Sequence, residues 1–439
     1  MENTYAYLKT VFQNLRHENS RNPSLIFILL VLWCIPLSYG FNSMAMALLF
    51  GYALFTFQKN NFRFNELLVL PVSLFLLMAI STLWSGDFNA SLRAVSKGLS
   101  LLLLPISFVL MAPLSAEQRQ KILRYYSYGI IIFSLYYLIR ATIRFLMTQN
   151  PNVFFYHELV TEDVNAIHVS VYVAVAAFYF ITKPSKSKGE IAAIILLAIL
   201  LLLLSSKNII VIFFILLAGY FLFCFKSERK GILLTFGAIF TIALLIVFSG
   251  KIKERFLIEF QSNTSENTVN TDIGTATEKV YNVSAERAWT AERFRKNDYF
   301  PGTAFRVYQI RIFTEMLNED KVFFTGYGVN AADAKIAAKA REHNLYEDYG
   351  KKNFHNEYIQ VFAELGIFGL LILLLMVVAN LQIALKTKDF VHISFAVLMI
   401  SLFLTESFLS RQRGIVFFTI FYCLFNAKND VPNTVKNKT

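Results

Sequence analysis

Long apolar runs separated by short polar segments make up most of the chain. Several runs approach the roughly 20 residues that a helix needs to cross a bilayer. One long polar stretch, residues 250–354, interrupts them. The pattern therefore predicts about twelve membrane-spanning helices, about nine before this stretch and about three after it. The predicted spans are residues 24–40, 41–58, 66–84, 92–113, 122–147, 165–182, 190–205, 208–225, 230–249, 357–385, 390–408 and 412–427.

The predicted fold is all-α, a polytopic membrane protein with one large loop domain between spans 9 and 10. Its parts are an N-terminal membrane domain (1–249), the loop domain (250–354), a C-terminal membrane domain (355–427) and a tail (428–439). Within the loop domain, Gln261–Thr277 is rich in Asn, Thr and Ser, which predicts irregular structure. Three later segments have helical composition, namely Ala285 to Arg295, Arg306 to Leu317 and Ala331 to Arg341.

The distribution of Lys and Arg sets the expected orientation. Cation-rich loops alternate with loops that are nearly free of cations: residues 183–188 hold three lysines, whereas 85–91 carry only Asp87. By the positive-inside rule both termini are cytoplasmic, and the loop domain lies outside the cytoplasm. The rule also explains most of the net charge of +12, so we expect no nucleic-acid partner.

Composition supports a membrane protein, since 56% of the residues are hydrophobic and 16% are charged. The cysteines all lie in apolar runs and are interpreted as small buried hydrophobes, not as a disulfide or metal framework. They are Cys34, Cys224 and Cys423.

Several cations break the alternation because they lie at the outward ends of predicted spans. A cation there is costly unless it snorkels, pairs with an acid or lines a functional cavity. For any single one the first two readings are as good as the third; Glu406, for example, is a possible counter-ion for Arg411 or Arg413. As a group they predict an outward cationic pocket suited to a phosphate-bearing lipid head group. These cations are Arg93, Lys97, Arg140, Arg144, Lys207, Arg411 and Arg413.

The loop domain adds two arginines, Arg306 and Arg311. Five positions apart on a helix, they do not share a face, so we expect only one to point into a site and favour Arg306. The segment Phe324–Asn330 follows, and its two glycines permit either close backbone approach to a ligand or an ordinary tight turn.

His355 lies where the polar stretch returns to an apolar run. Asn353 or Asn356 can cap the helix that begins there, and the positive end of that helix favours a neutral imidazole, as a base at neutral pH must be. Glu357, Gln360 and Glu364 form one polar stripe that could face a substrate cavity. An interfacial histidine with its stripe against a neighbouring helix is an equally good reading. Glu357 is the nearest carboxylate, and the other histidines considered, His157, His168 and His392, are interpreted as structural.

Several motifs are absent. The sequence has no Walker motif, no Asp-x-Asp pair for a metal–nucleotide sugar, no Gly-x-Ser-x-Gly elbow and no metal-ligand spacing of His and acids. Chemistry without a cofactor or metal on the outer face calls for a donor that is activated beforehand. A polyprenyl diphosphate-linked sugar fits, because Arg and Lys can stabilise the leaving diphosphate.

The sequence resembles the O-antigen ligase and polymerase superfamily of bacterial envelope glycan enzymes, over most of the chain. The most specific block is His355-Asn356-Glu357-Tyr358-Ile359-Gln360 followed by Glu364–Gly369. Weaker blocks occur in the expected order: Ser81–Asp87, Ser205-Ser206-Lys207, Arg306 and Gly326-Tyr327-Gly328.

The resemblance implies a GT-C-like, multi-pass protein of the bacterial inner membrane. It implies metal-independent transfer of a glycan from undecaprenyl diphosphate to lipid A–core or another glycan acceptor at the periplasmic face. His355 would be catalytic, and Arg306 and Lys207 would hold the diphosphate. The family often has Arg at the position of Lys207, and Lys lacks bidentate phosphate geometry. The further candidate substrate-binding residues are Arg311, Asn356, Glu357, Tyr358, Arg411 and Arg413.

Other functions remain open on the sequence. A polymerase that extends the lipid-linked glycan would use the same motifs, and a protein O-oligosaccharyltransferase is a third relative. A flippase for lipid-linked sugars belongs to another class, and it needs charged or polar residues deep within the spans. The cations gather instead toward one face, which favours an enzyme.

Overall fold

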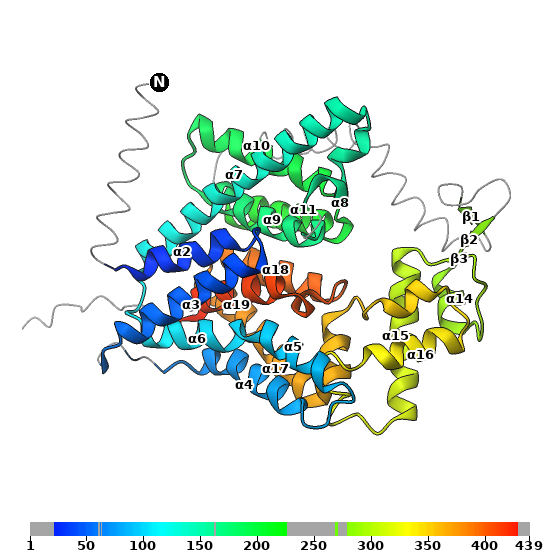
Figure 1. The fold of residues 1–439 in the computed structure, drawn as a ribbon. Coiled ribbons are helices and arrows are strands. Elements are labelled where there is room, and N and C mark those ends of the chain that lie inside the picture. The colour runs from blue at the N-terminus through cyan, green and yellow to red at the C-terminus, as the bar shows by residue number, and fades with distance from the viewer. Residues whose placement is uncertain are drawn as a thin grey trace, which may run out of the picture.

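The computed structural model describes residues 22–59, 62, 64–161, 164–225, 268–270 and 279–428. Most of them lie in helices, which pack into a bundle with the loop domain beyond one of its ends (Figure 1). The described helices that precede the loop domain are α2 (Ser24–Cys34), α3 (Tyr39–Phe55), α4 (Glu66–Ser81), α5 (Phe88–Gly98), α6 (Ser100–Leu110), α7 (Ala116–Thr148), α8 (Tyr156–Leu159), α9 (Ala166–Thr182), α10 (Lys188–Leu203) and α11 (Lys207–Gly219), with the short 3₁₀ helix η2 (Pro151–Phe154) and the short π-helix η3 (Tyr220–Cys224).

After the loop domain come α17 (Glu357–Thr387), α18 (Phe390–Phe403), the short 3₁₀ helix η5 (Phe408–Ser410) and α19 (Gln412–Asn426). A helix occupies each predicted span range except 230–249, which lies outside the described residues. Within the described part of the chain, four helical stretches are long and apolar enough to cross a membrane: Phe88–Leu110, Ala116–Thr148, Lys207–Cys224 and Glu357–Thr387. The total of twelve spans stays a prediction.

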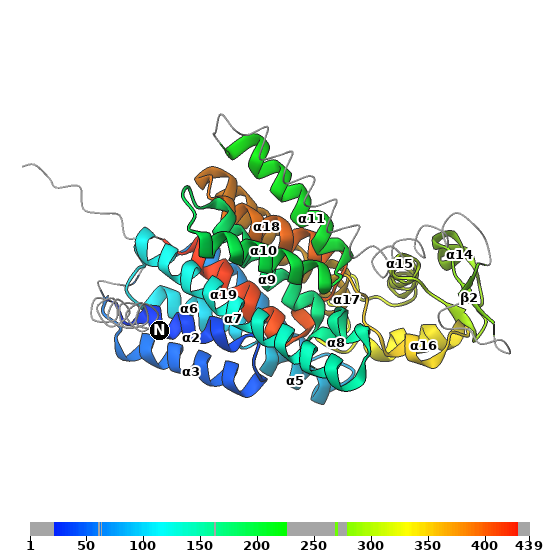
Figure 2. The ribbon, with the colours of Figure 1, turned by 90° about the horizontal axis from the view of Figure 1, so that it is seen from above.

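Two helices form the centre of the bundle. Every side chain of α19 from Arg413 to Asn426 is buried, and so is every side chain of α9 from His168 to Ile181. A helix that is apolar on all sides belongs in an interior, and Figure 2 shows α9 and α19 enclosed by the other helices. Aromatic contacts join the centre to α18, with the rings of Phe395 and Phe421 5.4 Å apart.

The loop domain has its own small core around Phe294, Phe300 and Tyr308. The three predicted helical segments are confirmed as α14 (Ala285–Thr290), α15 (Gly302–Glu319) and α16 (Asp333–Glu342), followed by the turn η4 (Glu347–Lys351). The all-α prediction missed a small sheet in which β1 (Val269–Asn270) is antiparallel to β2 (Val280–Asn282), and β2 is parallel to β3 (Asp298–Tyr299). Strands this short are too brief to show alternating hydrophobicity. Most of Gln261–Thr277 lies outside the described residues.

Backbone hydrogen bonds fasten the loop domain to α17. The amides of Tyr327 and Gly328 donate to the carbonyls of Ala363 and Glu364, each at 2.9 Å. The helix is broken at this point, because Gly366 has φ 68° and ψ −169°. A side chain at Gly366 would place its Cβ 2.1 Å from the carbonyl oxygen of Phe324. Only glycine permits this contact.

Residues at and after the end of α4 form hydrogen bonds with the same segment of the loop domain, Phe324–Asn330. The Oγ of Ser81 accepts from the amide of Val329 at 3.1 Å, and the Oγ of Ser91 donates to the Val329 carbonyl at 2.5 Å. The indole of Trp84 donates to the Thr325 carbonyl at 3.1 Å. The glycines of Phe324–Asn330 therefore approach protein backbone, so the sequence-based idea that they approach a ligand gains no support.

Candidate functional site

Segments from all over the chain meet at the C-terminal end of α18. The last carbonyls of a helix have no partner within it, and the end carries partial negative charge. Here side-chain donors satisfy them. Asn208 donates to the Ser401 carbonyl at 2.9 Å, and Tyr358 to the Ile400 carbonyl at 3.3 Å. Asn356 donates to the Leu404 carbonyl at 3.3 Å, and Arg306 donates twice to the Thr405 carbonyl, at 2.8 and 3.0 Å.

His355 stands directly before the helix α17. The Oδ1 of Asn356 caps this helix by accepting from the amide of Ile359 at 3.1 Å, and that of Asn353 accepts from the amide of His355 at 3.1 Å. His355 itself has φ 48°, an uncommon backbone conformation for a residue other than glycine. Its side chain is 28% exposed, and its Nδ1 lies 3.3 Å from Oε2 of Glu406.

Glu406 lies in the turn between α18 and α19 and is buried. Burial by itself raises the pKa of this carboxyl, but the hydrogen bond from His355 and nearby positive charge, including Arg306, outweigh it. The pKa of Glu406 is therefore lowered. An ionised carboxylate accepts the proton on Nδ1 and leaves the lone pair of Nε2 for another partner. The pair is arranged as a base held by an acid.

Arg306 reaches the turn from the loop domain. Its Nε and Nη2 donate to the carbonyl of Thr405, and its Nη1 donates to the carbonyl of Gly302 at 2.9 Å. A guanidinium has five N–H groups, so two are left over beside Glu406. Lys207 begins α11, and the neighbouring Asn208 also donates to Oγ1 of Thr405 at 2.8 Å. Of the two predicted diphosphate ligands, Arg306 contacts this turn directly, and Lys207 is the chain neighbour of Asn208, which also contacts it.

The other predicted residues lie elsewhere. Arg311 contacts Glu315 at 2.8 Å and donates to the carbonyl of Ala291 at 2.6 Å, inside the loop domain. Arg413 is buried, donates to the carbonyl of Leu37 at 2.7 Å and lies over the ring of Tyr39. Arg411 is exposed at the start of α19. The Oε2 of Glu357 accepts from the amide of Leu409 at 2.7 Å.

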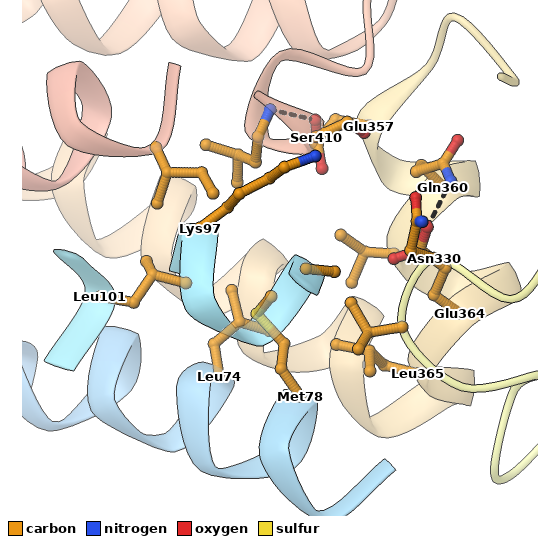
Figure 3. A pocket seen from close by; sticks show the side chains of 15 residues that line it. Leu74, Met78, Lys97, Leu101, Asn330, Glu357, Gln360, Glu364, Leu365 and Ser410 are labelled. Atoms are coloured by element: carbon orange, nitrogen blue, oxygen red, sulfur yellow. Dashed lines mark hydrogen bonds between the residues drawn. The ribbon is translucent and has the colours of Figure 1, made fainter. Parts of the chain in front are cut away.

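The polar stripe of α17 lines one small cavity. Glu357, Gln360 and Glu364 face it together with Lys97 of α5 and Ser410. Figure 3 shows the Lys97 side chain extended across this space toward Ser410. The cavity has a volume of about 50 Å³, which suits a few water molecules. The stripe therefore faces a cavity, which Leu409 and Ser410 also line.

Sequence reasoning missed two residues of the site. It considered Glu406 only as a counter-ion for Arg411 or Arg413, and it took Glu357 as the nearest carboxylate to His355. The structure pairs Glu406 with His355 instead. An acid between two apolar helices, as Glu406 is between α18 and α19, is itself a signal of function. Asn208 carried no signal beyond its place after Lys207. Among the residues described, no three His, Cys, Asp or Glu side chains group as a metal site would require.

Part of the chain matches a known protein family. Residues 191–374 fit the family model described as O-antigen ligase. The matched segment contains Lys207, Arg306 and His355 and ends before Glu406. No curated protein matches the chain.

Proposed function

We propose that this chain, whose residues 191–374 fit the family model described as O-antigen ligase, transfers a glycan from undecaprenyl diphosphate to an acceptor hydroxyl at the periplasmic face of the bacterial inner membrane. The family implies a glycosyltransferase-like enzyme that acts on lipid-linked glycans. The observation that carries the proposal is the His355–Glu406 pair beside Arg306.

His355 acts as the general base. The acceptor oxygen attacks the anomeric carbon of the donor sugar and passes its proton to Nε2 of His355. The bond between that carbon and the diphosphate oxygen breaks, and the diphosphate leaves with the electron pair. Glu406 holds the ring through Nδ1 and stabilises the imidazolium that forms. A positioned base of this kind contributes about 10²–10⁴-fold to a rate.

Arg306 and Lys207 bind the leaving diphosphate. The two N–H groups that Arg306 does not use in the protein donate to phosphate oxygens, and the ammonium of Lys207 adds charge. Both stabilise negative charge that grows in the transition state. In this proposal they take the part that a metal ion plays in other glycosyltransferases.

The favoured acceptor is lipid A–core, which makes the reaction O-antigen ligation. The large loop domain ahead of α17 supports this assignment, because a large outward loop before the tenth span resembles the ligases of the O-antigen ligase and polymerase superfamily. Polymerisation of the lipid-linked glycan is the alternative with the same chemistry.

The test is a gel of lipopolysaccharide and of carrier-linked glycan from a strain that lacks the protein. Ligation predicts loss of long chains from lipid A–core while polymer accumulates on the carrier. Polymerisation predicts core with a single repeat and no long polymer. Unchanged patterns in both pools would refute both reactions.

The same strain tests the catalytic residue. It is complemented with wild-type protein, His355→Ala or His157→Ala, where His157 is an exposed histidine of α8. Only the His355 variant should fail to restore transfer at equal membrane abundance. An active His355→Ala variant would remove His355 from the mechanism.

A further inference from the structure

Five exposed apolar side chains gather where the loop domain meets the membrane helices. Phe323 and Phe324 belong to a turn of the loop domain, and their rings lie 5.1 Å apart. Phe324 in turn lies 6.3 Å from Phe368 of α17. The indole of Trp84 donates to the carbonyl of Thr325, the residue after Phe324. Leu83 precedes Trp84 in the chain. Leu83 is 82% exposed, Phe324 63% and Phe368 55%.

This patch continues a surface that a bilayer covers. Below Phe368, the exposed residues Leu371, Leu375 and Val378 follow at helical spacing along α17, which is long and apolar enough to cross a membrane. Such a stripe on a spanning helix faces lipid. Since Phe324 contacts Phe368, the lipid-facing surface passes from α17 onto the loop domain.

Protein donors satisfy two of the three carbonyls of the turn, those of Phe323 and Thr325. Irregular backbone is tolerated at membrane depth only when protein groups satisfy its N–H and C=O groups. The carbonyl of Phe323 accepts from the amide of Ile367 at 2.9 Å, and that of Thr325 accepts from Trp84. The amide of Gly326 donates to the carbonyl of Val322 at 2.8 Å.

We infer that the turn 323–325 inserts into the leaflet beside the loop domain and, with Leu83 and Trp84, anchors this domain in lipid. The partner is the bilayer itself. Trp prefers the interfacial level of a membrane, Phe and Leu enter the boundary between head groups and acyl chains, and the exposed Lys321, just before the turn, can extend to lipid head groups. The anchor fixes the height of the loop domain, and thus of Arg306, above the membrane.

The experiment uses the full chain with its three cysteines replaced by alanine, in vesicles of phosphatidylethanolamine and phosphatidylglycerol. A single cysteine is introduced as Phe324→Cys or, for the control, as Tyr346→Cys, an exposed aromatic of the loop domain. Each is labelled with the fluorophore NBD. Quenching is measured with a nitroxide-labelled phosphatidylcholine and, separately, with aqueous iodide.

The lipid nitroxide should quench the label at position 324 several-fold more than the label at 346, and iodide should show the reverse order. Equal iodide quenching at both positions would overturn the inference.

A second measurement leaves the turn and the cysteines unchanged. The chain has three tryptophans. Trp33→Phe with Trp289→Phe leaves Trp84, in the patch, as the only one, whereas Trp33→Phe with Trp84→Phe leaves Trp289, an exposed residue of α14. Brominated lipids should quench Trp84 and spare Trp289. Equal quenching of the two would also count against the anchor.

Discussion

The Nδ1 of His355 lies 3.3 Å from the Oε2 of Glu406, although the residues are 51 positions apart in the chain. One precedes α17 and the other follows α18, so the packing of these two helices brings them together. The same helix end receives Arg306 from the loop domain and Asn208 from α11. The carbonyls at the end of α18, which accept these side-chain donors, therefore organise the site.

Replacing the carboxylate tests whether Glu406 positions the histidine. Glu406→Gln keeps the shape of the side chain and removes the negative charge that orients Nδ1–H and stabilises the imidazolium. We expect the transfer rate to fall about 100-fold or more, with little change in KM for the lipid-linked donor. Steady-state kinetics of purified protein provide the measurement. Glu347→Gln, at an exposed position in η4, is the control, and equal rates for the two variants would contradict the role.

The lowered pKa of Glu406 also predicts a pH dependence of stability. A carboxyl whose pKa is lower in the folded protein contributes stability above the unfolded value, about 4.3 for Glu, and loses it as the pH falls through the folded value. The thermal midpoint of the wild type should therefore exceed that of Glu406→Gln at about pH 6, and the difference should shrink toward about pH 3. Parallel midpoints across this range would mean that the pKa is not lowered.

The two arginines of α15 should differ when each is changed to lysine. Arg306→Lys keeps a charge but loses the double contact with the Thr405 carbonyl, so we expect KM for the donor to rise about tenfold. Arg311→Lys loses contacts within the loop domain, so it should lower the thermal midpoint and leave this KM near the wild-type value. The opposite assignment of the two effects would place Arg311 in the diphosphate site.

Replacing Gly366, which contacts the loop domain at Phe324, should destabilise the folded protein. Gly366→Ala combines a positive φ with a Cβ 2.1 Å from a carbonyl oxygen, and should lower the free energy of unfolding by at least about 2 kcal/mol. Gly51→Ala is the matched control, because it lies in α3 with no atom within 4 Å and should stabilise the protein by about 1 kcal/mol. Thermal unfolding in detergent distinguishes the two.

The Gly326-Tyr327-Gly328 motif illustrates how far local reasoning reaches. The sequence indicates a position where the backbone must come close to something. Whether the neighbour is a ligand or another part of the protein depends on residues far away in the chain. In the structure it is another part of the protein in both cases: a Cβ at position 326 would lie 2.3 Å from Glu364 of α17, and one at position 328 would lie 2.7 Å from the Cβ of Ser85.

The sequence by itself determined the largely helical fold with long apolar helices, the three helices of the loop domain and a capping asparagine at the start of α17, either Asn353 or Asn356, because hydropathy, helix propensity and capping act over a few neighbouring residues. His355 was identified as a candidate by its place at a membrane boundary, and Arg306 and Lys207 by their charge and by the family resemblance. Only the tertiary structure decided that Glu406, and not Glu357, contacts His355, and that Arg306 but not Arg311 reaches the turn. These contacts join segments whose relative position depends on helix packing, and no local property of the sequence encodes it.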